Sequence, residues 1–263
     1  RLATLWLQYR PARFIVSKSQ ITSSTQQVNV AGVVFPNRVG LAGGFDKNGD
    51  YIEALFSLGF GFVEVGTVTP KPQFGNPKPR LFRLTQDRAI INRMGFNNKG
   101  VDYLVEQLKQ RRAAGIVGVN IGKNKDTPLE LAADDYCCCL RKVYAYADYV
   151  VINISSPNTP GLRMLHGEDY LSGLLSKLTD CRKKLQLAQQ RTVPLFLKIS
   201  VDLSSEECAS VVDAVKQFGL EGIISSNTTV SRDALECTKH RDEIGGLSGA
   251  PLRQRAYDQL LHL

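Results

Sequence analysis

Short apolar runs alternate with longer segments of helical periodicity along most of the chain. The runs are almost unbroken in their hydrophobicity, which is typical of strands buried on both faces of a parallel sheet. They predict six strands, at residues 39–42, 62–65, 117–121, 149–154, 195–199 and 222–226. Apolar residues at helical spacing predict helices at 49–58, 100–112, 128–146, 168–190 and 204–218, and a last helix that begins near Pro251.

Local start and turn signals agree with this pattern. Thr127 followed by Pro128 and Glu130 predicts a capped helix start, and Ser204 with Glu207 predicts a capping box. Residues 28–36 predict a hairpin that turns at Ala31-Gly32 and serves as a lid.

Repeated strand–helix units predict an α/β fold, either a (β/α)₈ TIM barrel that is cut short or an open doubly wound sheet. An open nucleotide-binding sheet usually has a glycine-rich loop after its first strand, and no G-x-G-x-x-G occurs here. Instead, each predicted strand ends in glycine or a polar residue, and convergence of strand ends on one site favours the barrel. The residues at these ends include Gly43, Gly44, Lys47, Thr67, Asn120, Asn153, Ser156, Asn158, Lys198, Ser226, Asn227 and Thr228.

Composition restricts the classes of partner. The 263 residues are 43% hydrophobic and carry a net charge of +8, which favours anionic small molecules, nucleic acid or an anionic membrane surface. Lysines and arginines are spread along the predicted helices without clustered aromatics, so nucleic-acid binding is disfavoured. No apolar run reaches the roughly 18 residues that span a bilayer. Residues 1–14 predict a basic amphipathic helix, which either packs on the main body or contacts a membrane surface.

The candidate chemistry is dominated by neutral groups. The strand ends offer amides, hydroxyls and two lysines, while the three histidines fall in predicted loops or the last helix. A Ser-His-Asp triad or a histidine-bound metal is therefore disfavoured, and the six cysteines contain no C-x-x-C pair and predict free thiols without a metal. Asparagine amides can match the donors and acceptors of a flavin or a pyrimidine, and a lysine can stabilise a reduced flavin. This set favours a bound redox cofactor over acid–base hydrolysis.

Eight motifs, in order and in register, resemble class 2 dihydroorotate dehydrogenase from about residue 28 to the end of the sequence. The motifs are LAGGFDKNG (41–49), EVGTVTPKPQFGNPKPRLFRL (64–84), INRMGFNN (91–98), VNIGKNKDT (119–127), INISSPNTPGLR (152–163), LKIS (197–200), SNTTVSR (226–232) and GGLSGAPL (245–252). The family's enzymes are flavin-dependent (β/α)₈ barrels that oxidise (S)-dihydroorotate to orotate in de novo pyrimidine (UMP) biosynthesis, with a quinone as electron acceptor. Another FMN-dependent pyrimidine oxidoreductase of the same barrel type is the alternative.

The resemblance assigns roles by position. It implies FMN contacts at Gly43, Gly44, Lys47, Thr67, Asn120, Asn153, Lys198, Ser226 and Gly249. It implies substrate contacts at Lys47, Asn92, Arg93, Met94, Gly95, Phe96, Asn153, Asn158, Asn227 and Thr228. The catalytic base would be Ser156, where the soluble class 1 enzymes have cysteine, and hydride would pass from substrate C6 to flavin N5.

The resemblance also implies a domain organisation. Residues 1–27 would be the remnant of an N-terminal helical segment that contacts membrane and quinone, and 28–263 an FMN-binding barrel without its last two strand–helix units. A fragment that folds poorly and binds no FMN is the non-catalytic alternative. The implied enzyme is a peripheral membrane protein, with the cytoplasmic face of a bacterial inner membrane favoured over a mitochondrial one.

Overall fold

A six-stranded parallel sheet organises the fold, and the computed structural model describes residues 27–236 and 239–263. The strands are β3 (Gly40–Leu41), β4 (Phe62–Val68), β7 (Ile116–Ile121), β8 (Tyr149–Asn153), β9 (Leu195–Lys198) and β10 (Gly222–Ile224). They stand in the order β10-β9-β8-β7-β4-β3, which never reverses along the chain. A doubly wound sheet requires such a reversal, so the open-sheet alternative is excluded and the sheet is a parallel half-barrel. All six predicted strands are confirmed.

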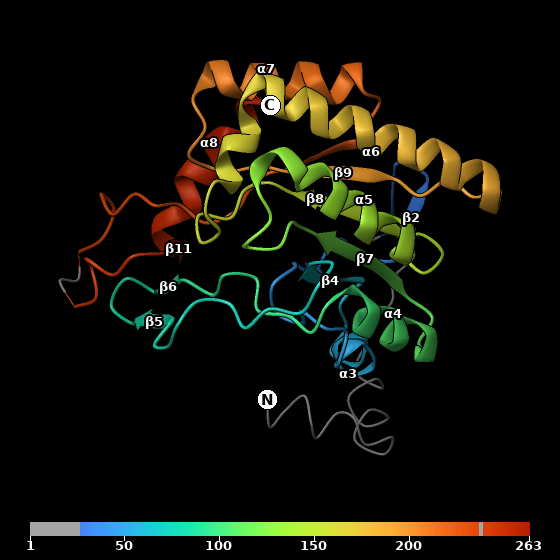
Figure 1. Ribbon diagram of the computed structural model, residues 1–263. Coiled ribbons are helices and arrows are strands. Elements are labelled where there is room, and N and C mark those ends of the chain that lie inside the picture. Colours follow the sequence, from blue (N-terminus) through green and yellow to red (C-terminus); the bar gives the residue numbers. More distant parts are fainter. Residues whose placement is uncertain (1–26, 237–238) are drawn as a thin grey trace.

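Helices cover the outer face of this sheet, as Figure 1 shows. They are α3 (Ile52–Ser57), α4 (Val101–Gln110), α5 (Ala132–Val143), α6 (Glu168–Gln189), α7 (Ser205–Gln217) and α8 (Arg253–His262), with short 3₁₀ turns at Leu129–Leu131, Leu162–His166 and Ala250–Leu252. Apolar residues of the strands and helices form one large core here, including fully buried Leu104, Val119, Leu140 and Ile152. Successive residues of β4, β7 and β8 are buried, and burial on both faces of a strand explains why these strands read as nearly unbroken apolar runs.

The two predicted helix starts differ in outcome. Ser204 and Glu207 form the expected reciprocal capping box at the start of α7. The predicted cap at Thr127 is wrong, because Pro128 is the extended residue that precedes the 3₁₀ turn Leu129–Leu131 and no side chain caps it. Thr127 therefore lies one residue too early to satisfy the first free amides.

The predicted hairpin is confirmed as β1 (Val28–Val30) and β2 (Val33–Phe35). The Phe35 ring lies 4.9 Å from that of Phe62 and 6.0 Å from that of Tyr149. Both partners begin their strands, so the hairpin covers the amino ends of the sheet and lies opposite the polar strand ends. The aromatic cluster supplies the apolar surface on which Phe35 is buried. The predicted segment 1–27 lies outside the described residues except for its last one.

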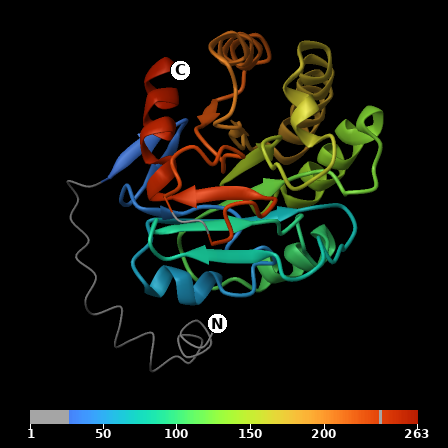
Figure 2. The same ribbon diagram turned by 90° about the vertical axis from the view of Figure 1, so that its left-hand side faces the viewer.

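A second, antiparallel sheet was not predicted. It contains β5 (Leu81–Leu84), β6 (Ala89–Asn92) and β11 (Gly246–Gly249) in the order β11-β6-β5. We call it the small sheet, and Figure 2 shows it in front of the parallel strands with the helices arranged around it. Phe82, Leu84, Ile91 and Leu247 form its apolar cluster. Its pairing joins Asn92 to Gly246, 154 residues later, which local patterning cannot indicate.

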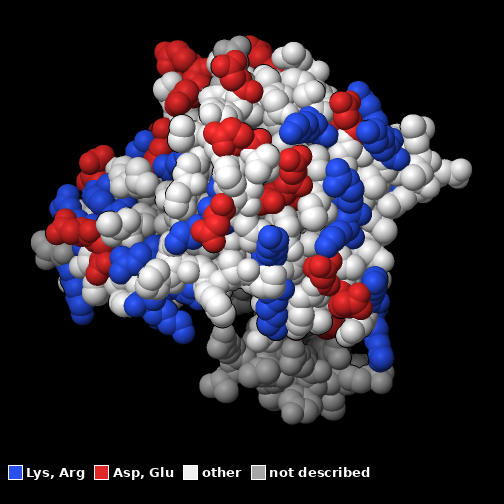
Figure 3. Space-filling view, in the orientation of Figure 1, with Lys and Arg blue, Asp and Glu red and all other residues white. Residues whose placement is uncertain are grey.

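Within the part of the chain that is described, no helix has the length and hydrophobicity to cross a membrane. On the face drawn in Figure 3, acidic and basic side chains are interspersed over the helices.

Candidate active site

Three predicted site residues meet at the carboxyl ends of neighbouring strands. Asn153 of β8 donates from its side-chain amide to the hydroxyl of Thr67 (2.9 Å) and to Oδ1 of Asn120 (3.1 Å). Thr67 donates its own hydroxyl hydrogen to Asn120 Oδ1 (2.5 Å). All three side chains are buried, and β4, β7 and β8 are adjacent strands of the sheet. Adjacent strand ends therefore make these contacts without any loop, with Thr67 at a register irregularity between Gly66 and Val68.

The contacts continue at both ends. Asn120 Nδ2 donates to Oε1 of Glu64 (2.7 Å), which sequence reasoning missed. At the other end, Ser155 Oγ donates to Asn153 Oδ1 (2.9 Å) and accepts from Nδ2 of Asn227 (2.9 Å). We call the six residues Glu64, Thr67, Asn120, Asn153, Ser155 and Asn227 the amide network.

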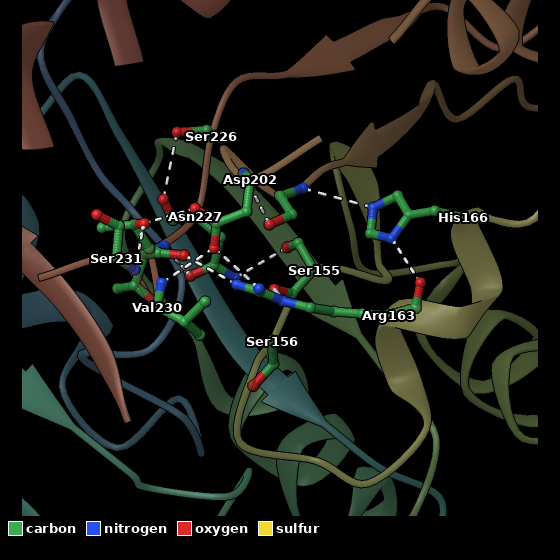
Figure 4. Close-up of polar contacts among 12 residues, drawn as sticks. Ser155, Ser156, Arg163, His166, Asp202, Ser226, Asn227, Val230 and Ser231 are labelled. Carbon is green, nitrogen blue, oxygen red and sulfur yellow. Dashed lines mark hydrogen bonds and ion pairs between the residues drawn. The ribbon is translucent and has the colours of Figure 1, made fainter. Parts of the chain in front are cut away.

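The two adjacent serines are therefore not equivalent. The Ser155 hydroxyl uses both its hydrogen and a lone pair within the amide network. Ser156 is 6% exposed, and its Oγ accepts only the backbone N–H of Asn158 (3.2 Å), with no acceptor for its own hydrogen among the described residues. Figure 4 shows the Ser156 side chain directed away from the Arg163–Asp202 contact. Of the two hydroxyls, only that of Ser156 keeps a free hydrogen.

A second buried hydroxyl in the same loop was missed. Thr159 follows Ser156 by three residues, is 5% exposed, and its Oγ1 has no hydrogen-bond partner among the described residues. Its position in the serine-containing motif was the available signal, since a threonine there repeats the chemistry of the predicted base.

The predicted substrate residues on β6 are close to the serine loop. Asn158 donates from Nδ2 to the backbone oxygen (3.1 Å) and to Oδ1 (3.3 Å) of Asn92. Asn76 Nδ2 in turn donates to the Asn158 backbone oxygen (3.1 Å). Phe96 is buried, and a side chain added at Gly122 would meet both Phe96 and Thr67, so Phe96 lies beside the amide network.

Other residues of the predicted substrate segment have structural contacts. The Arg93 guanidinium pairs with Glu243 at 2.6 Å and lies over the Phe82 ring, so its side chain is committed to the small sheet. The backbone of Met94 and of Gly95 holds the loop at 73–76, through Asn76 and Gln73. The substrate contacts implied for this segment remain predictions.

The two lysines occupy different surroundings. Lys47 donates to the backbone oxygen of Gly44 (2.6 Å), and burial together with the nearby Arg80 guanidinium lowers the pKa of Lys47. Lys198 is 7% exposed, lies in register beside Asn153, and has no hydrogen-bond or ion-pair partner among the described residues. A buried ammonium without a partner is costly, so Lys198 is a candidate to bind an anionic or carbonyl group.

The carboxylate beside Lys47 has a structural role. Asp46 is 2% exposed and accepts hydrogen bonds from the backbone N–H groups of Asp50 (3.0 Å) and Tyr51 (2.8 Å). Burial raises the pKa of Asp46 despite these bonds. Asp46 therefore fixes the turn that precedes α3.

Glycine geometry leaves room for a flat ligand. Gly44 has φ of +110°, and nothing lies within 4 Å of the position that a Cβ would take. Gly43 is packed more closely, because its N–H donates to Glu64 Oε1 and an added Cβ would lie 2.4 Å from that oxygen. A cavity of about 460 Å³ on the inner face of the sheet reaches Ala42, Glu64 and Lys198, and the rest of its lining is mainly the hairpin and the aromatic cluster at the amino ends of the strands.

Ser226 and Gly249 are the two remaining predicted FMN contacts. Ser226 donates from its hydroxyl to the backbone oxygen of Asn227 (3.2 Å). Gly249 ends β11 with φ of +106°, where an added Cβ would lie 2.4 Å from the Arg88 backbone oxygen. Its neighbours belong to the small sheet, and the implied FMN contact of Gly249 remains a prediction.

An arginine joins the loops around Ser156, which the sequence did not indicate. Arg163 donates to the backbone oxygens of Ser155 (Nε, 3.3 Å) and Thr228 (Nη2, 3.1 Å) and pairs with Asp202 (2.9 Å). Asp202 also accepts from the Thr229 hydroxyl and from the Val230 N–H (3.0 Å). Figure 4 shows these groups converging from loops that follow β8, β9 and β10. A single guanidinium thus links three strand-end loops.

Histidine and metal chemistry find little support in the described residues. His166, expected in a loop, is 7% exposed at the end of a 3₁₀ turn and contacts the Arg163 backbone oxygen through Nδ1 (2.9 Å). Burial lowers its pKa. Across residues 27–236 and 239–263, no three His, Cys, Asp or Glu side chains are grouped as metal ligands.

Comparison with known proteins gives one consistent family. The model of the family described as dihydroorotate dehydrogenase matches residues 25–263. The chain is 53% identical over 236 residues to "Dihydroorotate dehydrogenase (quinone)" of Saccharophagus degradans, covering 90% of this chain and 70% of that relative. It is 59% identical over 223 residues to the protein of the same name from Coxiella burnetii, covering 85% and 64%.

A solved structure has the same fold. The crystal structure of DHODH from Eimeria tenella in complex with ferulenol matches with a TM-score of 0.86 and 38% identity, over 97% of this chain and 75% of that one. The chain thus spans between 64% and 75% of the length of these three proteins.

Proposed function

The chain belongs to the quinone-type dihydroorotate dehydrogenase family, and we propose that the complete protein oxidises (S)-dihydroorotate to orotate with FMN as cofactor and a quinone as electron acceptor. The observation that carries the proposal is the contrast between the two serines at the network. The Ser155 hydroxyl gives its hydrogen to Asn153 and accepts from Asn227, whereas Ser156 keeps its hydrogen free beside the substrate-segment contact of Asn158 with Asn92. A hydroxyl that takes a proton from a ring fixed by amides matches this oxidation.

The residues present fit a flavin. Lys198 offers a buried ammonium with no partner in the described part of the chain, and Gly44 leaves open space beside its backbone. Thr67 and Asn120 add buried polar groups at the neighbouring strand ends. When bound, FMN supplies the acceptor for the substrate hydride. Lys198 is then placed to stabilise negative charge on the reduced ring.

The remaining roles in the proposed reaction are proton acceptance and orientation of the substrate. Ser156 accepts the proton from substrate C5, which requires that this proton be acidified and that a hydroxyl or water relay carry it onward, because serine is a weak base at neutral pH. Asn92, Asn158 and Asn227 orient the pyrimidine ring, and Lys47 binds its carboxylate. Orientation by fixed amides removes the entropy of aligning C5 with Ser156.

The location and the full fold are parts of the same proposal. The parallel half-barrel is completed to eight strands in the whole protein, with residues 1–27 contributing to a segment that contacts quinone and the cytoplasmic face of a bacterial inner membrane. The relatives named as quinone enzymes are bacterial, which supports the quinone and the bacterial membrane in this proposal. Liposome flotation of the full-length protein is expected to fail when residues 1–14 are deleted; unchanged flotation would place the membrane contact elsewhere.

The test of the activity is Ser156→Ala in the full-length protein. Dihydroorotate-dependent bleaching of flavin absorbance is expected to slow by about 10²- to 10⁴-fold at neutral pH, the usual contribution of a general base. Orotate binding should be retained, because Ser156 does not orient the amides. Ser176→Ala, on the exposed side of α6, is the matched control. An unchanged rate in Ser156→Ala would reject Ser156 as the base.

A further inference from the structure

Glu64 is a buried carboxylate in the middle of an apolar strand, and the implied site contacts do not include it. It is 4% exposed, and its Oε1 accepts from Asn120 Nδ2 (2.7 Å) and from the Gly43 N–H (3.2 Å). We propose that Glu64 is a positioning residue whose acceptor oxygen sets the direction of every hydrogen bond in the amide network. The inference rests on the proposed function in one respect, since the ligand that these amides orient is the pyrimidine or flavin.

The argument begins with what a carboxylate oxygen can do. It accepts hydrogen bonds and donates none, so the group of Asn120 that faces Glu64 must be the NH₂. The carbonyl of Asn120 is thereby turned toward Thr67 and Asn153, and each of these must donate to it. Glu64 thus decides the orientation of the Asn120 amide. The Thr67 hydroxyl could not do so without Glu64, because a hydroxyl can either donate a hydrogen bond or accept one.

The direction then passes along the remaining residues. Asn153 uses one amide hydrogen on Thr67 and the other on Asn120, so its carbonyl must face Ser155. That carbonyl accepts from the Ser155 N–H (3.2 Å) and Oγ (2.9 Å). Since the Ser155 hydrogen is spent, its oxygen accepts from Asn227 Nδ2. Every side-chain hydrogen bond of the amide network is therefore donated in the direction that leads toward Glu64.

This polarity determines what a ligand meets. Both side-chain hydrogens of Asn153 are occupied, whereas Asn120 and Asn227 each use one hydrogen of the NH₂ group in the network. The amide hydrogens left over are therefore one on Asn120 and one on Asn227. These are donors, so the network is set to recognise carbonyl oxygens of a planar ring. Without the acceptor at Glu64, Asn120 can rotate and present its own carbonyl instead.

The same polarity keeps Ser155 out of the chemistry. The Ser155 hydroxyl gives its hydrogen to Asn153 and one of its two lone pairs to Asn227, so it has no free hydrogen to pass along a proton relay. Through Asn120 and Asn153, Glu64 thus determines that the Ser155 hydroxyl hydrogen is bonded within the network while that of Ser156 stays free.

The experiment compares Glu64→Met with Glu64→Gln in the full-length protein. Methionine has similar length but lacks the acceptor, whereas glutamine keeps an oxygen that can accept from Asn120. Two quantities are measured: the Kd of orotate by titration, and the solvent-exchange rates of asparagine side-chain amides by ¹⁵N NMR. We expect Glu64→Met to weaken orotate binding and to speed exchange at Asn120 and Asn153, each by about tenfold or more, and Glu64→Gln to restore both to within about threefold.

A matched control separates positioning from stability. Glu207→Met removes the capping box of α7, far from the network in the chain, and should lower the melting temperature without changing orotate binding or amide exchange. If it changed both as Glu64→Met does, the effect would be one of stability and the proposal would be overturned. Unchanged binding and exchange in Glu64→Met would overturn it as well.

Two further outcomes of the Glu64 experiment also decide the role of this residue. If Glu64→Met does not fold, Glu64→Asp withdraws the acceptor oxygen while keeping the charge, and it should speed exchange at Asn120; no change would count against the proposal. If wild-type protein shows no dihydroorotate-dependent flavin reduction, the proposed function fails, but amide exchange in the Glu64 variants still decides the role of Glu64.

Discussion

The amide network and the loops beside the small sheet are held by different kinds of contact. In the network, short side chains bond to one another, all of them amides or hydroxyls except the Glu64 carboxylate, and all but Asn227 are buried. Around the small sheet, long arginines reach backbone oxygens and carboxylates: Arg163 as described, Arg93 with Glu243, and Arg232 with the backbone oxygens of Glu243 (2.9 Å) and Gly245 (2.7 Å). We call Arg93, Arg163 and Arg232 the arginine braces.

The difference follows from the backbone beneath each region. Adjacent parallel strands bring Thr67, Asn120 and Asn153 within reach of each other at their carboxyl ends, with Thr67 at a register irregularity of β4, so short side chains suffice. Loops have no register, and a planar guanidinium with several donors can join segments that lie at irregular distances. The network should therefore respond to loss of hydrogen-bonding atoms, and the braces to loss of charge.

The strongest test of this contrast is Arg163→Met. It removes the bonds to Ser155, Thr228 and Asp202 and leaves a part-buried carboxylate without its main ion pair. We expect the free energy of unfolding to fall by about 2–4 kcal/mol. The rate of flavin reduction should also fall by about ten- to a hundredfold, because the Ser156 and Asn227 loops lose their common anchor.

Arg182→Met is the matched control for Arg163. Arg182 is also part-buried, pairs with Glu221 at 2.7 Å and donates to the Gly219 backbone oxygen, but these partners precede β10, whereas the serine loop follows β8. It should lose comparable stability, measured by urea unfolding, and keep its flavin reduction rate. Equal rate losses in both variants would show that the braces contribute stability alone.

An intermediate effect is expected for Thr67→Val in the network. The hydroxyl between Asn120 and Asn153 is lost with little change of shape, while the direct Asn153–Asn120 bond remains. Unfolding should become easier by about 1–2 kcal/mol. Since threonine does not titrate, this loss should be the same at pH 5 and pH 8 when measured by thermal melting. A pH-dependent loss would contradict the view that Thr67 stabilises the network through neutral groups alone.

The smallest effect is the pH dependence contributed by Asp202. Burial alone would raise the pKa of Asp202, but hydrogen bonds from Thr229, the Val230 N–H and Arg163 outweigh it, so the pKa lies below its usual value. A carboxyl with a lowered pKa stabilises the fold above its unfolded pKa of about 3.9, and that stability is lost as pH falls through the folded value.

Asp202→Asn should therefore lower the melting temperature at pH 7, and the gap from wild type should narrow below about pH 4. Thr67→Val should show no such narrowing. A gap that stayed constant to pH 3 would mean that the charge of Asp202 does not stabilise the braced loops.

The sequence predicted much of the site because its residues follow strands. Thr67, Asn120, Asn153 and Lys198 each lie at or near the end of an apolar run, and the adjacent parallel strands then bring these ends together. Glu64 carried a signal that was overlooked: a carboxylate inside the run FVEVGTV is rare in a buried strand unless it has a partner. Arg163 gave no such signal, since an arginine after a loop is usually exposed.

Periodicity alone determined the six parallel strands, their helices and the order of the polar strand ends. A strand that is buried on both faces must be apolar at nearly every position, so each strand can be recognised from its own residues. Periodicity could not determine the small sheet, which joins β6 to β11 across most of the chain, or that the hairpin lies at the amino ends. Nor could it distinguish Ser155 from Ser156, which are neighbours of the same type. The resemblance singled out Ser156 by its position, and the tertiary structure supplied the physical difference. Ser155 is bonded to Asn153, two residues before it, and to Asn227, which the loop after β10 brings into place.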